Sequence, residues 1–508
     1  MLVHEQVGDV GALPELTKSW QQGQIPVATR SSDVAPPTAI LGIPFDHLTL
    51  AEAVRRVEAM IASGQPHYLV TANVDFLVQA RQDVELRRIL AEADLVLCDG
   101  TPLVWISRLL GHPLPERVAG ADVAPLLLEA AARKKYRVFF LGGQPEITLQ
   151  AVQNLQEQHP DLIICGCYSP PFQSLLEMDH EEILRWIRPA RPDVLFVSFG
   201  CPKAEKWIAM HYRSLGVPVT IGVGATIDFL AGTKKRAPRW MQRSGSEWIF
   251  RLLQEPRRLF RRYMTDLWQF GGAILQQWWW LRAPWRPLGL SSAHPILVDE
   301  EFWNYIVVRG PFHAESLRRN AATWAQAQGN HCLLDLGLVT FIDSAAVGLL
   351  IQLQKRLQAE GFSLVLLQPS AVVARALRLM RQTNFFRIAT DIAEARELIR
   401  ARERTPSVVP PNSVGPLVWQ GEITAHNAAE VWENTEAHIV ARSLREGTLT
   451  IDLSGVRFLD STGAGLMARA KRQALQLGAN LHFTHPSEDV LNVVRLARLQ
   501  NFLFGGRP

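Results

Sequence analysis

Six short apolar runs, each followed by a segment with helical periodicity, occupy the chain between about residues 39 and 230. Their sequences are HYLVTA, ADLVLCDG, YRVFFLGG, DLIICGC, PDVLFVSFG and VPVTIGVG. Continuous apolar strands that alternate with helices are typical of a parallel sheet covered on both faces. The sequence therefore predicts a doubly wound α/β domain over residues 38–232. Residues 1–37 are polar and irregular, and we expect them to form a flexible leader.

The composition excludes several classes of protein. Of the 508 residues, 47% are hydrophobic and 20% are charged, which argues against disorder and collagen-like repeats. The sequence contains no run of ~18 apolar residues, so no membrane-spanning helix is expected. The first residues do not have the pattern of a signal peptide, so none is expected. The five scattered cysteines form no CxxC pair, so neither a disulfide framework nor a zinc site is expected and a reducing cytoplasm fits best.

A basic, tryptophan-rich segment follows the predicted sheet, over residues 233–290. From residue 231 to residue 290 there are 12 Lys/Arg against three acids, and seven of the 15 tryptophans. Basic and interfacial aromatic side chains favour an anionic membrane surface. Nucleic acid is the competing partner for such a stretch, but no nucleic-acid motif accompanies it, so none is expected. A basic helix that is merely solvated remains the alternative.

The last two hundred residues contain an internal repeat. Thirteen residues recur at a fixed offset of 117, among them Asp343 and Ser344, which return as Asp460 and Ser461. Each copy is predicted to consist of a strand, an Asp-Ser turn, a helix, a strand and a helix. The repeat predicts two small α/β domains joined by a Pro/Ser-rich linker. Their expected bounds are 298–403 and 415–508, with the linker at 404–414; a further linker ending in SSAHP is expected before the first copy.

Polar residues and glycines stand where the apolar runs of the first domain end. In an open parallel sheet, ligands bind at the carboxyl ends of the strands. Glycine there lets the backbone approach a ligand and leaves helix amides free for an anion, although tight turns also require glycine for structural reasons alone. The candidate residues are Thr71, Asn73, Asp99, Gly142, Gly143, Gly200, Gly222 and Gly224.

Asp99 is the strongest candidate for a catalytic residue in this set. It follows the run ADLVLC and precedes Gly100 and a predicted helix with Pro102 in its first turn. A carboxylate at this position could accept a proton from an attacking hydroxyl, while Thr71 and Asn73 orient the same substrate. The alternative is that Asp99 is simply the N-cap of its helix.

Several motifs of the first half carry a resemblance to a known family. They are LVTANVDFL, ADLVLCDGTPLVW, ERVAGAD, VFFLGG, FVSFGCPKAEKW, GVGATIDFLAGTKKRAPRW and GSEWIFRLLQEPRRLFRRY. In order and spacing, over about residues 40–265, they resemble the WecG/TagA/CpsF family of bacterial glycosyltransferases. The resemblance implies a Rossmann-like domain that moves an N-acetylmannosaminyl or related sugar from a UDP donor to a lipid-diphosphate-linked acceptor. It further implies inversion at the anomeric centre without a metal or other cofactor.

The same resemblance implies roles for single residues. Asp99 corresponds to the general base, Thr71 and Asn73 to pocket residues, and Arg117 with Asp122 to substrate-binding residues of an RVxGxD motif. The departure is Ala204, where members of the family commonly carry Gln, so one donor contact or the identity of the sugar is open.

Three arginines of the basic segment are candidate catalytic residues. Arg251, Arg258 and Arg261 are spaced by seven and three residues, which predicts one shared helix face. Breaking a UDP-sugar bond leaves a diphosphate, and without a metal its charge must be met by basic side chains or helix N-termini. The family resemblance assigns functional arginines with similar spacing.

Both copies of the C-terminal repeat resemble the STAS domain of anti-sigma-factor antagonists. The second copy contains TIDLSGVRFLDSTGAGLMARAKRQA and the first contains the more diverged LLDLGLVTFIDSAAVGLLIQLQKRL. In regulated STAS domains the Ser/Thr after the Asp is phosphorylated, so Ser461, Thr462 and Ser344 are possible phosphorylation sites. Plain helix capping is the alternative for an Asp-Ser pair. An interaction module with a protein partner is expected.

Taken together, the sequence predicts a cytoplasmic glycosyltransferase, peripheral at the inner face of the cell membrane, that acts in exopolysaccharide or cell-surface glycan synthesis. A dinucleotide-dependent oxidoreductase is disfavoured because no GxGxxG with a downstream acid occurs. A catalytically impaired, transferase-like scaffold in STAS-mediated signalling remains the alternative. Ala204 favours that alternative, while retention of Asp99 and the arginines opposes it.

Overall fold

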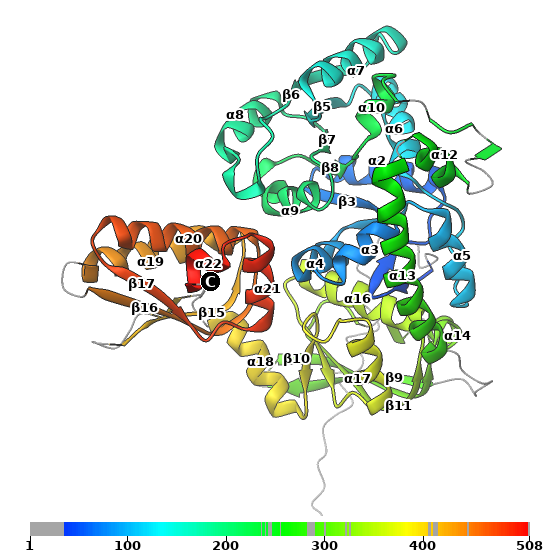
Figure 1. Ribbon diagram of the computed structural model, residues 1–508. Coiled ribbons are helices and arrows are strands. Elements are labelled where there is room, and N and C mark those ends of the chain that lie inside the picture. Colours follow the sequence, from blue (N-terminus) through cyan, green and yellow to red (C-terminus); the bar gives the residue numbers. More distant parts are fainter. Residues whose placement is uncertain are drawn as a thin grey trace, which may run out of the picture. The chain divides into compact units, whose positions relative to one another are not determined.

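The first half of the chain is built around a six-stranded sheet (Figure 1). All neighbouring strands run parallel, and the six predicted apolar runs supply one strand each. In spatial order the strands are β4 (Leu95–Cys98), β3 (His67–Ala72), β8 (Val219–Gly222), β7 (Val194–Ser198), β5 (Arg137–Gly142) and β6 (Ile163–Tyr168). The prediction of a parallel sheet is confirmed.

The computed structural model describes most of the chain, and residues 36–508 form one compact unit. The predicted leader lies almost entirely outside the described residues. These are 35–234, 236–238, 240–241, 246–254, 256–281, 290–298, 301–320, 323–324, 327–404, 408–409, 415–443 and 447–505.

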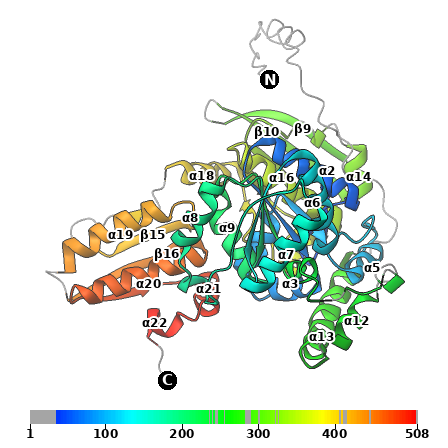
Figure 2. The same cartoon turned by 90° about the horizontal axis from the view of Figure 1, so that it is seen from above.

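Helices lie on both faces of the sheet (Figure 2). Alternate side chains of each strand point to opposite faces, so both faces carry apolar residues that the helices bury. Phe140 and Phe196 stack on one face with ring centroids 5.4 Å apart, whereas Phe139 and Leu195 belong to the core on the other. The first face is covered by α2 (Leu50–Ser63), α6 (Gly120–Lys134), α7 (Pro145–Gln158) and α10 (Thr226–Leu230). The second is covered by α3 (Val74–Ala80), α4 (Val84–Glu92), α5 (Thr101–Leu109), α8 (His180–Ala190) and α9 (Lys203–Leu215), with the short 3-10 helix η1 (Leu175–Glu177) before α8. The doubly wound prediction is confirmed.

Local sequence signals set the ends of these helices. At the start of α2, the Thr49 hydroxyl accepts a hydrogen bond from the Glu52 backbone, and the Glu52 carboxylate accepts one from the Thr49 backbone. This reciprocal pair satisfies amides that the first turn leaves free. Gly64 ends the helix with a φ of 67°, a conformation that glycine adopts without strain.

The basic segment forms two helices, α12 (Glu247–Gln254) and α13 (Pro256–Leu281) (Figure 1). The prediction that Arg251, Arg258 and Arg261 share one helix is therefore wrong, since Arg251 lies in α12 and the other two lie in α13. The physical reason is Pro256: proline has no amide hydrogen to continue a preceding helix, yet is favoured at the first position of a new one. Phe270 and Ile274 of α13 join the core on the second face of the sheet.

The C-terminal repeat forms two further sheets. The first has the order β13 (Arg387–Ala389), β12 (Leu364–Leu367), β11 (Cys332–Ile342), β10 (Glu301–Phe312) and β9 (Leu290–Val298). The second has the order β14 (Val408–Val409), β15 (Leu417–Ile423), β16 (Thr448–Leu459) and β17 (Asn480–Thr484). Their helices are α14 (Ala314–Arg319), α16 (Ser344–Ala359), α17 (Ala371–Leu379) and α18 (Ile392–Arg404) in the first copy, and α19 (Ala428–Ser443), α20 (Ser461–Gln476), α21 (Glu488–Leu496) and α22 (Gln500–Phe504) in the second. The predicted order of strand, Asp-Ser turn, helix, strand and helix is present in both copies.

One predicted linker is a strand. The residues around SSAHP form β9, which pairs antiparallel with β10 at the edge of its sheet, so the linker prediction is wrong there. The linker was predicted because Pro295 is unfavourable inside a sheet. Proline is tolerated in an edge strand, however, because its missing amide hydrogen removes no hydrogen bond between central strands. In the linker predicted at 404–414, Val408–Val409 form β14, which pairs with β15.

The first repeat copy packs closely on the sheet domain. The hairpin of β1 (Thr38–Ile40) and β2 (Ile43–Phe45) lies against α16, and Ala39 and Ala91 belong to the core of that copy. Gln382 donates to the Gly42 carbonyl at 2.6 Å, and the buried Lys355 ammonium donates to the Ala93 carbonyl. In the described part of the chain, no helix combines the length and apolar character needed to cross a membrane.

Candidate active site

Asp99 lies at the carboxyl edge of the sheet, beside the end of β3. Its backbone amide donates to the Ala72 carbonyl at 2.9 Å, and the Val118 amide donates to the Cys98 carbonyl at 2.8 Å. These bonds bring the loop before α6 alongside Asp99. The N-cap of α5 is Gly100, which makes no side-chain cap, so the capping alternative for Asp99 is wrong.

Thr71 and Asn73 occupy the neighbouring strand end. The Asn73 side chain caps α3, since its oxygen accepts from the amides of Asp75 (3.0 Å) and Phe76 (3.4 Å). Thr71 is buried, and a Cβ placed on Gly120 would lie 3.0 Å from its hydroxyl oxygen. The first residue of α6 therefore packs directly on Thr71, which places the start of that helix at the same edge as Asp99.

Arg117 and Asp122 belong to a charged network at this edge. Arg117 binds Asp122 at 2.7 Å and Glu247 at 2.9 Å, and Arg236 binds the second oxygen of Asp122 at 2.5 Å. The sheet domain supplies two members, and the basic segment supplies Arg236 and Glu247. Sequence reasoning missed those two, although both stand inside motifs of the family resemblance. The network anchors the start of α12 next to the loop between α5 and α6, which lies alongside Asp99.

The glycines at the other strand ends divide into two kinds. A Cβ on Gly142 would lie 2.6 Å from the Ser198 carbonyl oxygen, and one on Gly143 would lie 2.6 Å from the Thr148 hydroxyl, so close packing alone accounts for both. Gly200 and Gly224 have φ values of 77° and 49° and no atom within 4 Å of such a Cβ. Backbone at those two turns is open to a ligand.

Gly222 faces a buried acid that sequence reasoning did not select. A Cβ on Gly222 would lie 2.8 Å from Oε1 of Glu205, which is 4% exposed. Oε2 of Glu205 is buried and has no hydrogen-bond partner among the described residues. Burial raises the pKa of this carboxyl to about 7. The preceding residue, Ala204, is packed in the core beside Trp207. Perturbed acids of this kind are candidate functional groups, and the only available signal was the position of Glu205 in FVSFGCPKAEKW.

The pKa of Glu205 predicts a pH-dependent stability difference. Its folded pKa lies above its ordinary value of 4.5, so the unfolded chain loses this proton first as pH rises. Glu205 therefore weakens folding progressively between pH 4.5 and about 7. Relative to wild type, we expect Glu205→Gln to gain roughly 3 kcal/mol in free energy of unfolding across that interval. Urea denaturation at pH 5 and pH 8 measures the gain.

The exposed α7 variant Glu146→Gln is the control and should follow the wild-type profile. Parallel profiles for Glu205→Gln and wild type would contradict the prediction.

The side chains of Arg251, Arg258 and Arg261 lie outside the described residues, but their helices are placed. Trp248 of α12 and Tyr263 of α13 pack edge to face, with ring centroids 6.0 Å apart. Because Glu247 binds Arg117, α12 begins at the edge that carries Asp99. Among the described residues, no group of three or more His, Cys, Asp and Glu is arranged to hold a metal ion.

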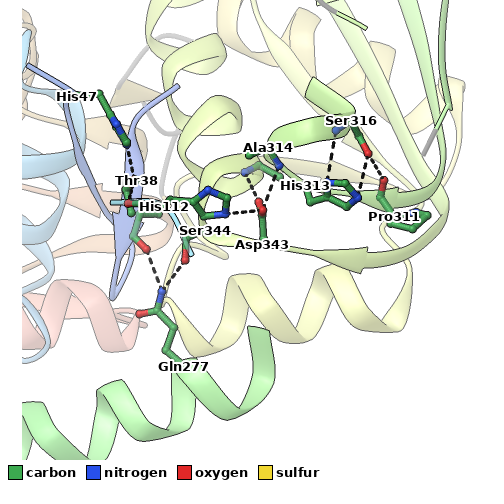
Figure 3. A network of polar contacts seen from close by, with 12 residues as sticks. Thr38, His47, His112, Gln277, Pro311, His313, Ala314, Ser316, Asp343 and Ser344 are labelled. Carbon is green, nitrogen blue, oxygen red and sulfur yellow. Dashed lines mark hydrogen bonds and ion pairs between the residues drawn. The ribbon is translucent and has the colours of Figure 1, made fainter. Parts of the chain in front are cut away.

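The Asp-Ser pair of the first repeat copy contacts the sheet domain and α13 (Figure 3). Asp343 accepts from the Ala346 amide and thus caps α16, and its other oxygen lies 2.6 Å from Nε2 of His112. The Gln277 side-chain amide donates to the Ser344 hydroxyl at 3.1 Å and to the Ala39 carbonyl at 2.9 Å. Capping, the alternative from the sequence, is confirmed for Asp343.

The second copy repeats this arrangement with different partners. Asp460 caps α20, while the Ser461 amide and hydroxyl each donate to a different oxygen of Glu85 at 2.7 Å. Glu85 also binds the Lys206 ammonium at 2.8 Å, and Lys206 follows Glu205 in α9. The Thr462 hydroxyl is buried, and no partner for it lies among the described residues. Both Asp-Ser pairs are therefore occupied by side chains from the transferase domain or the basic segment.

Comparisons with known proteins agree with this architecture. Residues 38–284 match the family described as Glycosyl transferase WecG/TagA/CpsF. The protein named N-acetylglucosaminyldiphosphoundecaprenol N-acetyl-beta-D-mannosaminyltransferase from Bacillus spizizenii is 34% identical over 198 residues, which are 39% of this chain and 75% of the relative. A Staphylococcus aureus protein of the same name is 30% identical over 224 residues, covering 44% of this chain and 86% of the relative.

A doubly wound sheet with these motifs at its carboxyl edge defines the class, and the chain is a glycosyltransferase that transfers a hexosyl unit. It belongs to the WecG/TagA/CpsF family.

The two repeat copies match STAS models at residues 312–395 and 413–504, the second described as "Mlab, STAS domain". A solved Thermotoga maritima structure, described as a candidate anti-sigma factor antagonist, covers 21% of this chain and 94% of its own at 21% identity and a TM-score of 0.19. The two family matches show that two STAS domains follow the transferase domain, as predicted.

Proposed function

We propose that the protein transfers an N-acetylmannosaminyl or related hexosyl unit from a UDP donor to a lipid-diphosphate-linked acceptor ending in GlcNAc. The transfer inverts the anomeric centre, requires no metal, and belongs to exopolysaccharide or cell-surface glycan synthesis. The names of the relatives, which act on N-acetylglucosaminyldiphosphoundecaprenol, support the acceptor. The observation that carries the proposal is the ion pair of Arg117 and Glu247, which fixes the basic segment beside the strand end that bears Asp99.

Asp99 is the proposed general base. The hydrogen bond from its backbone amide to the Ala72 carbonyl holds the main chain of Asp99 in place, so its side chain starts from a fixed position at the sheet edge. There it can take the proton of the acceptor hydroxyl as that oxygen attacks the anomeric carbon. Around it, the proposed substrate contacts are Thr71, Asn73, Arg117, Asp122, Gly142, Gly143, Gly200, Gly222 and Gly224. Of these, the open turns at Gly200 and Gly224 are best suited to a phosphate approaching backbone amides.

The arginines Arg251, Arg258 and Arg261 are proposed to neutralise the UDP leaving group. Departure of UDP concentrates negative charge on its diphosphate, and guanidinium groups are suited to that charge because they bind phosphate oxygens in pairs. Removing one such contact typically costs ~2 to 4 kcal/mol at the transition state. The anchoring of α12 through Glu247 supports their participation at this edge.

The direct test is a transfer assay with a panel of UDP-sugars and a synthetic lipid-diphosphate-GlcNAc acceptor, with and without EDTA. We expect one donor to give product at a rate unchanged by EDTA. Absence of transfer from every donor would contradict the proposal and favour the scaffold alternative. Loss of transfer in EDTA that is restored by a divalent cation would contradict metal independence alone.

The basic helices are proposed to hold the enzyme on the inner face of the cell membrane. Their described surface carries large exposed side chains, including Trp268 (83% exposed) and Trp279 (76% exposed). Interfacial tryptophans and basic residues together stabilise binding to anionic bilayers, at ~1 kcal/mol for each basic residue near the surface.

Replacing Trp268 and Trp279 by Ser should therefore lower cosedimentation with phosphatidylglycerol vesicles at least tenfold, since each substitution removes apolar area from the interface. The matched control is Phe172→Ser, because Phe172 is 98% exposed but lies outside α12 and α13. Equal losses of cosedimentation in both variants would contradict a membrane contact made through α12 and α13.

The STAS pair is proposed to regulate the transferase by docking on it within the same chain. Both Asp-Ser pairs already have partners ahead of the repeat, namely Gln277 and His112 for one copy and Glu85 for the other. A phosphate on Ser461 would face the Glu85 carboxylate, and like charges repel. Phosphorylation at Ser461, and by analogy at Thr462 or Ser344, is thus proposed to release the domain.

A further inference from the structure

A pocket opens where the transferase domain and both STAS domains meet. It has a volume of about 420 Å³ and is bordered by Arg81 and Arg87 of the transferase domain, Arg381 of the first STAS domain, and Asp489 and Arg495 of the second. The same first three arginines also border a neighbouring pocket alongside α13. Polar bonds hold this junction together: Asn492 donates to the Gln82 carbonyl at 2.9 Å, and Asn384 donates to Asp489 at 2.6 Å.

Within the residues that the structure describes, three of the arginines donate to backbone carbonyls alone. Arg81 donates to Gln269 at 2.7 Å, and Arg381 donates to the Arg81 carbonyl at 2.5 Å. Arg87 donates to Ala80 at 2.9 Å, to Arg81 at 3.2 Å and to Arg381 at 3.3 Å. Within the described part of the chain, none of the three has a carboxylate within ion-pair distance. The pocket is therefore bordered by four arginines but only two acids, Glu488 and Asp489, so positive charge is in excess along its described lining.

Two of the three acids nearby bind other groups. Asp83 caps α4 and binds Lys206 at 2.8 Å, and Asp489 accepts from Asn384. Glu488 borders the pocket but is exposed. Burial, together with the charge of Arg381, lowers the pKa of Arg87 to about 10, although Asp489 and Asp83 act in the opposite direction. The same two causes lower the pKa of Arg81. Repulsion among these guanidinium groups opposes the docked arrangement unless a ligand supplies negative charge.

We infer that this pocket binds a phosphate-bearing ligand of about nucleotide size, which contacts the transferase domain and both STAS domains at once. Guanidinium forks match phosphate oxygens, and the volume lies within the range of small-molecule sites. The site is separate from the proposed catalytic edge, because its arginines come from the α3–α4 loop, α4 and the segment after α17. The inference stands whether or not the proposed donor and acceptor are correct. A bound anion would stabilise the docked state of all three domains.

The experiment measures binding by the full-length protein with three soluble probes. Calorimetry with inorganic pyrophosphate and with ATP reports a free phosphate, whereas calorimetry with glycerol 1-phosphate reports a lipid headgroup without the bilayer that α12 and α13 are proposed to bind. We expect at least one probe to bind wild type, and to bind at least tenfold more weakly to Arg81→Gln and to Arg381→Gln, since each loses a charge-assisted contact. A soluble probe that binds should also raise the Tm of wild type but not of the variants.

Two further variants separate this site from others. Arg185→Gln, an exposed change on α8, is the matched control and should bind like wild type. Arg251→Gln tests the proposed donor site and should leave this binding unchanged. The inference is overturned if no probe binds wild type, if Arg81→Gln and Arg381→Gln bind as wild type does, or if only Arg251→Gln abolishes binding. Arg381 is exposed, so its substitution keeps the test valid even if a change at the partly buried Arg81 impairs folding.

Discussion

Asp99→Asn should lower kcat for sugar transfer by ~10² to 10⁴, the usual contribution of a general base. The amide keeps the shape of the side chain and the backbone bond to Ala72, but it cannot take the proton of an acceptor hydroxyl. The KM for the donor should change only a few-fold, because the lost interaction forms mainly in the transition state. Steady-state transfer with the donor identified from the UDP-sugar panel measures both constants.

Asp161→Asn is the matched control for this substitution. Asp161 lies just before β6, at the opposite edge of the sheet, and pairs with Lys135 at 2.6 Å on an exposed surface. Its replacement should leave kcat within two-fold of wild type. If Asp99→Asn retained more than a tenth of wild-type kcat, Asp99 would not be the base.

Ser461→Glu should detach the second STAS domain from the transferase domain. Ser461 is 5% exposed, and both of its donors are bonded to Glu85, so the new carboxylate would be forced against an existing one. Leaving a buried charge without its partner typically costs about 3 to 5 kcal/mol. Small-angle scattering should show a larger radius of gyration, and hydrogen exchange should increase around residues 83–87 and 461–464.

A charge-reversal variant separates repulsion from general misfolding. Glu85→Lys combined with Ser461→Glu should restore much of the docked state, because opposite charges then face each other. Ser454→Glu is the surface control, since Ser454 is exposed on β16 and should leave the radius unchanged. An unchanged radius in Ser461→Glu, or a rise that Glu85→Lys does not reverse, would contradict docking through this contact.

The sequence predicted best those features that depend on residues close together in the chain, such as the strands and their ends. Strands buried on both faces must be apolar along their whole length, so all six runs of the first domain could be recognised individually. Asp99 could be placed at the sheet edge because the end of such a run is itself the edge. The break between α12 and α13 was also available from the sequence, since Pro256 marks it, but the spacing of the arginines suggested a single helix.

Contacts between distant segments could not be foreseen. Arg117 meets Glu247 across 130 residues, and Glu85 meets Ser461 across 376. The spacing of these residues in the sequence does not predict either contact, because both contacts depend on how whole domains pack. Glu205 was missed for a related reason: its burial against Gly222 follows from the order of β7 and β8 in the sheet, whereas the sequence displays only an acid in a helix.

Gln277 joins α13 to two other parts of the molecule through a single side chain. Its one amide group accepts from the Leu41 backbone at 2.8 Å and donates to Ala39 and Ser344, so α13, the β1–β2 hairpin and the start of α16 meet at a single side chain. Any tilt of α13 would strain all three bonds together, so this helix and the first STAS domain are mechanically linked. If the proposed membrane contact of α13 is correct, adsorption to a bilayer should therefore change the hydrogen bonding of Ser344.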